Sequence, residues 1–227
     1  MERNSRKLSR FIPVLLPVWL LSYILLTGFS TFKHNFFYPI PVYEKITVDA
    51  YGAVLPAILS FSFIILYFSF FKGSVLRFLG CFLFAFALSA FSFAPTLTDD
   101  SFGLQSLPGS LAFFISPVSI LIIFFDDYAL KTKTMLNSIS SRIGRNYIVA
   151  LLVTFSVSSL SALSVDLIWA PFLNQSPAWN TVNIGGAGLT DGVLFSGLFA
   201  LVWTTFFVSF LALIVEILRT SQRKDND

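Results

Sequence analysis

Apolar residues along the chain fall into six long runs that are separated by short polar breaks. The runs occupy residues 11–32, 50–71, 75–94, 107–125, 147–170 and 185–218. None of them has a hydrophilic face, and at about 20 residues or more each can cross the hydrocarbon core of a bilayer as a helix. The pattern predicts an all-α, polytopic membrane protein with six transmembrane helices.

The fourth run is the least regular of the six. Pro108 and Pro117 interrupt it, so we expect either a kinked helix or a re-entrant segment, because neighbouring helices can satisfy the carbonyls that a proline frees. The polar stretch over residues 126–146 carries apolar residues at roughly helical spacing. This spacing predicts a short amphipathic helix on the membrane surface.

Basic residues predict the orientation of the chain. If the amino terminus is cytoplasmic, 13 of the 15 Lys and Arg residues fall in cytoplasmic segments, and only Lys33 and Lys45 fall outside. This asymmetry follows the positive-inside rule for an even number of spans. We expect a basic cytoplasmic amino terminus over residues 1–10, one transmembrane domain over residues 11–218 and a polar cytoplasmic tail over residues 219–227, in the cytoplasmic (cell) membrane.

Composition agrees with this picture and excludes several classes of protein. The chain is 56% hydrophobic and 12% charged, about half the charged fraction of a soluble domain. The basic residues are scattered over short loops, so nucleic-acid binding is not expected. Cys81 and His34 are the only residues of their kinds, so neither a disulfide, a metal site nor a cofactor is predicted. The expected partners are the lipid bilayer and another membrane protein, as partner or substrate, and the oligomeric state stays open.

Three acids near the outer ends of the runs are the candidate functional groups: Asp49, Asp166 and Asp191. Charged side chains are costly in hydrocarbon, which makes acids near a span candidates for a functional site. Asp166 and Asp191 each lie about 6 to 9 Å inside the ends of the hairpin formed by runs five and six, at 1.5 Å per residue. Two carboxyls at one depth can share a proton, as those of aspartic proteases do.

Small residues recur every four positions on both helices of this hairpin. The two stripes comprise Thr154, Ser158, Ala162 and Asp166 in run five, and Gly188, Gly192, Ser196, Ala200 and Thr204 in run six. Such stripes let two helix backbones approach closely. A hairpin closed along them is expected to bring Asp166 and Asp191 toward each other.

The same acids also have a structural interpretation. Residues 185–218 are longer than a span requires, so the hydrocarbon could begin at Val193 and leave residues 185–192 as a loop and helix start. Asp191 would then lie in a first helical turn, where the helix dipole favours a carboxylate, and Asp166 beside Trp169 would be interfacial.

Three functions therefore stay open: an intramembrane aspartyl-type protease that uses Asp166 and Asp191, a membrane scaffold or assembly partner, and a proton- or ion-coupled transporter. Few polar residues occur in the inner halves of the spans, which counts against transport. The chain has no complete catalytic motif, which favours the scaffold.

Two further segments stand out. Residues 38–44, Tyr-Pro-Ile-Pro-Val-Tyr-Glu, are stiff and predicted to form a lid or an interfacial anchor, with Tyr43 and Glu44 as accessory neighbours of the acids. Gly185, Gly186 and Gly188 form a glycine-rich stretch. We do not expect it to bind phosphate, because no lysine follows and no strand is predicted before it.

Four segments together resemble a known family. They are residues 38–44, residues 52–56 (Gly-Ala-Val-Leu-Pro), residues 165–168 (Val-Asp-Leu-Ile) and residues 183–192 (Asn-Ile-Gly-Gly-Ala-Gly-Leu-Thr-Asp-Gly). Their order and spacing are similar to those of an uncharacterised prokaryotic multi-pass membrane family, domain of unknown function 1614, over about residues 35 to 205.

That family usually has Gly-Ala before the first aspartate, where this chain has Ser164 and Val165. It has no established activity, so the resemblance implies the importance of Asp166 and Asp191 without naming a reaction. A looser likeness is to presenilin-type intramembrane proteases, which also place aspartates on consecutive helices; their Gly-x-Gly-Asp motif is interrupted here by Leu189 and Thr190.

Overall fold

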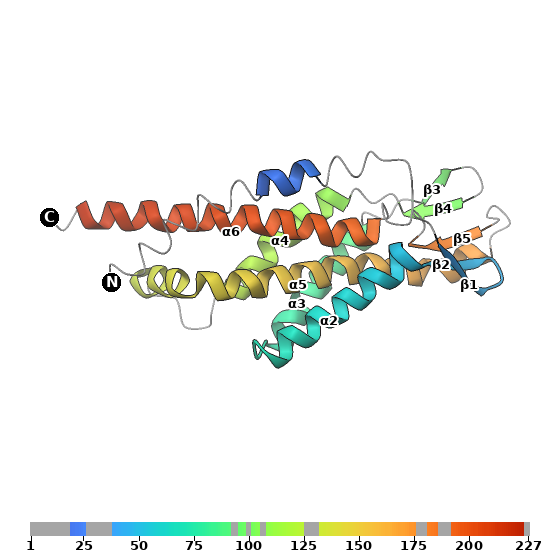
Figure 1. Ribbon diagram of the computed structural model, residues 1–227, viewed down its shortest axis with the longest axis horizontal. Helices are drawn as coiled ribbons and strands as arrows, with labels where there is room; N and C mark the ends of the chain where they lie inside the picture. The colour runs from blue at the N-terminus through green and yellow to red at the C-terminus, as the bar shows by residue number, and fades with distance from the viewer. Residues whose placement is uncertain are drawn as a thin grey trace.

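The chain folds into a helical bundle with a five-stranded sheet at one end (Figure 1). The structure is a computed structural model, and it describes residues 19–25, 38–91, 95–98, 101–104, 108–124, 132–175, 181–185 and 192–224. In addition to the helical residues 19–25, the elements are β1 (Pro39–Tyr43), β2 (Ile46–Asp49), η1 (Ala50–Val54), α2 (Leu55–Ser69), α3 (Val75–Phe91), β3 (Pro95–Thr98), β4 (Ser101–Leu104), α4 (Pro108–Phe124), α5 (Thr132–Asn174), β5 (Thr181–Ile184) and α6 (Gly192–Lys224).

The membrane prediction is confirmed in its coarser form. Among the described residues, three helices are long and apolar enough to cross a membrane: Ala50–Ser69, Asn146–Asn174 and Val193–Val215. The segments Val75–Phe91 and Leu111–Ile123 are shorter apolar helices. Of the first predicted run only residues 19–25 are described, and they are helical. Trp19 of this helix packs on α6, with its ring centroid 4.9 Å from that of Phe206.

Three predicted boundaries change. Residues 132–145 are helical, but they are the first turns of α5, so the prediction of a separate surface helix was wrong. Helix α4 is continuous through Pro117 and starts at Pro108, a position that needs no amide donor. The sixth run does not begin as a helix at Gly185, because residues 181–184 form a strand and α6 starts at Gly192.

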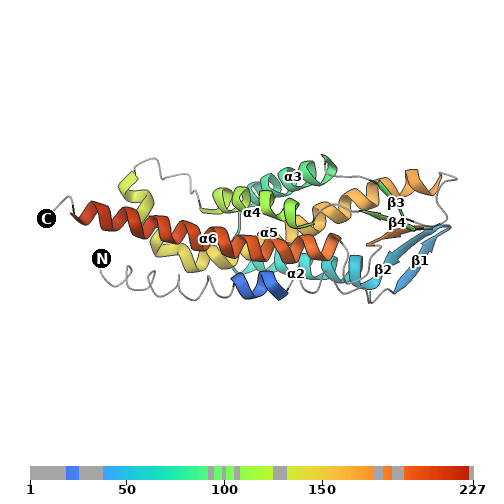
Figure 2. The ribbon, with the colours of Figure 1, turned by 90° about the horizontal axis from the view of Figure 1, so that it is seen from above.

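The sheet corrects the all-α prediction. Its order is β1-β2-β5-β4-β3, with antiparallel hairpins β1–β2 and β3–β4 on either side of β5, which runs parallel to both of its neighbours. The hairpins precede α2 and α4, and β5 lies between α5 and α6. Three connections that are distant in sequence thus meet at one end of the bundle, as Figures 1 and 2 show.

Strand β1 forms one edge of the sheet and is exposed along its whole length. The amide of Ala50 donates to the carbonyl of Tyr38, and Ile40 pairs with Val48, so by the alternation of an antiparallel pair the positions of Pro39 and Pro41 face away from β2. Prolines there leave no amide donors for an added strand. The segment predicted as a lid is therefore a blocked edge strand.

The sheet packs one face against the end of α5. Side chains of alternate residues on β2 and β5 contact α5 and Ala53 of η1. The buried residues of this cluster are Ala53, Ala170, Val182 and Ile184, and the partly buried ones are Ile46, Val48, Leu163 and Leu173. On the opposite face, the Thr47 hydroxyl hydrogen-bonds to the Asn183 side chain across the parallel pair. The period of two along each strand separates these faces.

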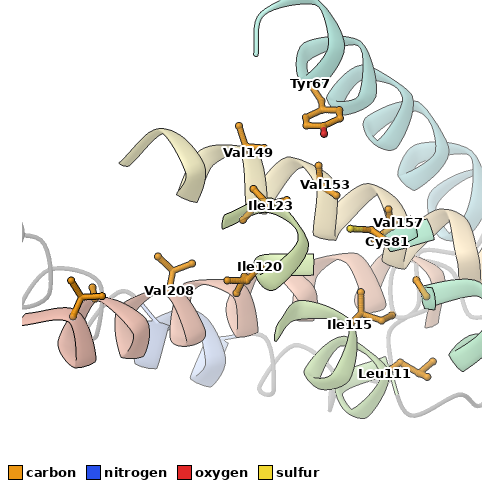
Figure 3. Packing of buried hydrophobic residues seen from close by; sticks show 14 residues of the cluster. Tyr67, Cys81, Leu111, Ile115, Ile120, Ile123, Val149, Val153, Val157 and Val208 are labelled. Carbon is orange, nitrogen blue, oxygen red and sulfur yellow. The ribbon is translucent and has the colours of Figure 1, made fainter. Parts of the chain in front are cut away.

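Helix α5 is the centre of the bundle and contacts α2, α3, α4 and α6. Within its apolar segment 67% of residues are buried, against 28% for the segment that contains α2. Figure 3 shows Val149, Val153 and Val157 of α5 in the apolar core. Because four helices pack against α5, its small side chains decide how closely they approach it.

Hydroxyl groups join α5 to each of these neighbours except α4. Thr154 and Thr204 hydroxyls lie 2.9 Å apart between α5 and α6, and those of Ser161 and Ser89 lie 3.1 Å apart between α5 and α3. The Ser156 hydroxyl donates to the Ser60 carbonyl of α2 at 3.1 Å. Such bonds hold membrane helices together where the hydrophobic effect cannot.

Helix α6 comes close to α5 at Gly197. A Cβ at this position would lie 2.2 Å from the Ser159 hydroxyl oxygen and 2.8 Å from the Phe155 ring. We predict that Gly197→Ala lowers stability by about 1 to 3 kcal/mol, because a side chain forces the packed helices apart. Thermal unfolding in detergent measures the change.

Gly80→Ala is the matched control, since a Cβ at Gly80 in α3 would meet nothing within 4 Å. This substitution should be neutral or slightly stabilising, because alanine is the better helix former. Equal destabilisation by the two substitutions would contradict the close approach at Gly197.

Candidate functional site

Asp49 lies where the sheet joins the bundle and is fully buried, with 0% of its surface exposed. Its Oδ2 accepts a hydrogen bond from the backbone amide of Tyr38 at 2.7 Å, and its Oδ1 accepts from the amides of Tyr51 at 2.9 Å and Gly52 at 2.6 Å. The carboxylate thus caps η1 and holds the start of β1. Three amide donors around one carboxylate are the arrangement of a structural anchor.

Gly185 lies beside Asp49 at the carboxyl ends of two parallel strands. Val48 pairs with Ile184, so the next residues, Asp49 and Gly185, leave the sheet at the same edge. Gly185 has a φ of 70°, which favours glycine. A Cβ there would lie 2.6 Å from the backbone nitrogen of Ala53, so this glycine lets the end of β5 press against η1.

Asp166 of α5 lies next to Gly185. It is buried, with 5% of its surface exposed, and its Oδ2 accepts from the backbone amide of Gly185 at 3.4 Å. Gly185 contacts η1 and is hydrogen-bonded by Asp166, and η1 is capped by Asp49. We call Asp49, Asp166 and Gly185 the joint, since they connect the sheet to the bundle.

Several predicted site residues lie outside the described residues: Asp191, Gly186 and Gly188. Gly192, which follows Asp191 in the sequence, is the first residue of α6. The expectation that no strand precedes the glycine-rich stretch was wrong, because β5 ends directly before Gly185. No lysine follows the stretch, so it still lacks a phosphate-binding motif.

Ser158 and Ser196 lie against each other between α5 and α6. The Ser158 hydroxyl donates to the Ser196 carbonyl at 3.0 Å, and the Ser196 hydroxyl donates to the Ser158 carbonyl at 3.2 Å. Each hydroxyl is thereby occupied in helix packing. Residues of the two predicted stripes thus lie at the contact between α5 and α6. Gly197, the residue after Ser196, also lies close to α5.

The structure does not bring Tyr43 and Glu44 to the acids. They lie at the turn of the β1–β2 hairpin, at the opposite end of β2 from Asp49. The Asn174 side chain, at the end of α5, donates to the Glu44 carboxylate at 2.9 Å. The hydrogen bonds from Asn174 and Tyr43 lower the pKa of Glu44. The bond between Tyr43 and Glu44 also raises the pKa of Tyr43.

The joint has the chemistry of an attachment. Both carboxylates accept backbone amides, and neither faces solvent. Among the described residues no group of three or more His, Cys, Asp and Glu side chains is placed to hold a metal ion. What this part of the chain can do is satisfy backbone amides of two connections, residues 38–52 and 181–185, where they meet the bundle.

Two contacts that complete the site were missed from the sequence. The hydrogen bond from Asn174 to Glu44 links the end of α5 to the β1–β2 turn. The Thr47–Asn183 pair links β2 to β5. The only available signal was that Asn183 lies in the glycine-rich segment of the resemblance. Contacts between residues so far apart in sequence depend on the strand order, which the pattern did not reveal.

Comparison with known proteins adds no relative: no family model, no curated protein and no solved structure matches the chain. The resemblance to the uncharacterised family thus stays a prediction.

Asp49→Ala is predicted to lower stability by at least about 3 kcal/mol, because three buried amides lose their acceptor at about 1 to 3 kcal/mol each. The stability of Asp49→Asn should fall between those of the wild type and Asp49→Ala. The asparagine carbonyl can still accept from the η1 amides, but its NH2 group would face the Tyr38 amide, which is also a donor. Thermal unfolding of the purified protein measures both. Glu44→Gln is the control on the exposed turn, and a similar loss there would contradict the anchoring role of Asp49.

Proposed function

We propose that the chain is a six-span protein of the cytoplasmic membrane, with both termini in the cytoplasm and the sheet on the outer side. All three connections that the basic residues predict to be outside contribute the strands of the one sheet. A chain with an odd number of crossings between these connections could not gather them at one end. This arrangement thus supports the alternation of inner and outer connections on which the count of six spans rests.

Helix lengths support a common hydrocarbon boundary at the joint. The apolar segments of η1–α2 and α6 begin at Ala50 and Val193, and Asp166 reaches the same level through Gly185. From Asn146 to Asp166 a helix rises about 30 Å, the thickness of the hydrocarbon core. The joint then lies at the outer boundary, and α5 continues beyond it beside the sheet.

The function that this arrangement supports best is that of a membrane scaffold or assembly partner. The observation that carries it is the use of Asp49 and Asp166: both carboxylates accept the amides that fix the sheet to the bundle. A rigidly attached outer module with a blocked edge strand is suited to present one surface to another membrane protein.

Transport has less support. A Cβ at Gly197 would collide with Ser159 and Phe155, so an aqueous path along this part of the α5–α6 contact has no room. The hydroxyls of Ser158 and Ser196 bond to backbone carbonyls across the same contact.

An intramembrane aspartyl protease that uses Asp166 and Asp191 is the second candidate. One observation favours it: Asp166 is a buried acid at the proposed membrane boundary and contacts Gly185, from which six residues lead to Asp191.

The proposed topology predicts which cysteines react from outside the cell. In a Cys81→Ala background, Glu44→Cys at the hairpin turn should react with a membrane-impermeant maleimide in intact cells. Ser74→Cys, in the exposed turn between α2 and α3, should react only after the membrane is opened. The reverse pattern, or reaction of both in intact cells, would contradict the orientation.

Asp166→Asn separates the two candidate functions. Asparagine keeps the shape and one acceptor for the Gly185 amide but cannot carry the proton or the charge of a catalytic acid. If the protein is a scaffold, we expect the variant to keep its native complexes, measured by gel electrophoresis of solubilised membranes, with at most about 1 kcal/mol loss of stability.

A protease predicts one further outcome for the same variant. Native complexes and stability would be retained, yet a membrane protein that is cleaved in wild-type cells would accumulate at full length. Finding such an uncleaved substrate when the membrane proteomes of wild-type and variant cells are compared would overturn the scaffold proposal. Asn174→Asp, which alters the far end of the sheet module and leaves Asp166 intact, is the matched control.

A further inference from the structure

We propose that the end of α5 beyond Asp166 is seated in the phospholipid headgroup layer, so that the bilayer surface is the partner of its uncovered face. We call this face the α5 collar and define it as Leu167, Ile168, Trp169 and Phe172. The depth of the collar rests on the boundary given under the proposed function, and the orientation of the chain decides only which leaflet it contacts.

The collar is where the central helix comes into the open. Leu167 is 51% exposed, Ile168 50%, Trp169 41% and Phe172 65%, whereas Val165 and Ala170 are buried. The buried residues face the sheet and the joint, so the exposed arc points away from the sheet. All four of its side chains are apolar, which is unfavourable in water.

Depth places the collar in the headgroup layer. Trp169 and Phe172 lie three and six residues beyond Asp166, which corresponds to about 4.5 and 9 Å along the helix. A bilayer of 40 to 45 Å with a 30 Å core has a polar layer of about 5 to 8 Å on each side. Trp169 then lies within this layer, and Phe172 lies at its outer limit.

The chemistry of the side chains fits the same layer. Trp169 and Phe172 are in ring contact, with centroids 5.9 Å apart, and tryptophan is enriched where apolar chains meet headgroups. A third exposed aromatic, Tyr38, directly precedes β1 and is 64% exposed. Its amide donates to Asp49, so it lies at the level of the joint. Two distant elements thus present exposed aromatics near one boundary.

Lipid quenching of a fluorophore tests the proposal on the full chain. In a Cys81→Ala background, Phe172→Cys is labelled with an environment-sensitive fluorophore and reconstituted in phosphatidylcholine vesicles. Some vesicles carry a spin label near the headgroup, others near the end of the acyl chain, and iodide probes the water. We expect the shallow label to quench about twofold more strongly than the deep label or iodide.

Each other result overturns the proposal. Stronger quenching by iodide puts the face in water, stronger quenching by the deep label puts it in the hydrocarbon core, and protection from all three means that protein covers it. Ile168→Cys, on the same arc, is the second variant if Phe172→Cys does not fold.

Two controls calibrate the depth. Phe61→Cys on α2, which is exposed near the middle of an apolar segment, should be quenched by the deep label, and Glu44→Cys by iodide. A wrong orientation would change only the side from which iodide reaches the Glu44→Cys label, whereas a wrong collar would change the depth of Phe172→Cys. Failure of the topology and failure of this inference are therefore distinguishable.

Discussion

The packing of α5 is the constraint on which the rest of the structure depends. This helix contacts four others, so where two backbones approach closely its residues have to be small, or polar in the right place. Serine and threonine meet both needs, because their hydroxyls bond to carbonyls or to hydroxyls of the neighbouring helices. Gly197 completes the arrangement from the side of α6.

At the sheet end the governing requirement changes from shape to hydrogen bonding. Two of the three connections that end there, residues 38–52 and 181–185, have backbone amides that bond to buried carboxylates. Asp49 accepts three of them and Asp166 accepts the amide of Gly185. Asp49 and Asp166, two of the three candidate acids, thus have a structural use that needs no substrate, and this supports the proposed assembly role.

Much of the helical architecture could be predicted from the sequence, and the sheet could not. Long apolar runs locate α2, α5 and α6 because a span needs about 20 apolar residues. The strands have four or five residues, and β1 carries two prolines, so no alternation stands out. The depth of Asp49 and Asp166 was accessible through span ends, whereas their amide partners depend on strand pairing between distant segments.

The strand order also constrains how the chain can be assembled. Strand β5 lies between the two hairpins and pairs with both, yet it follows α5 in the sequence. During synthesis from the amino terminus, β1–β2 and β3–β4 are made before the strand that unites them exists. Each hairpin alone is only marginally stable. The sheet is therefore completed only after α5 has been made, and a truncated chain that ends before residue 181 lacks the strand that joins its two halves.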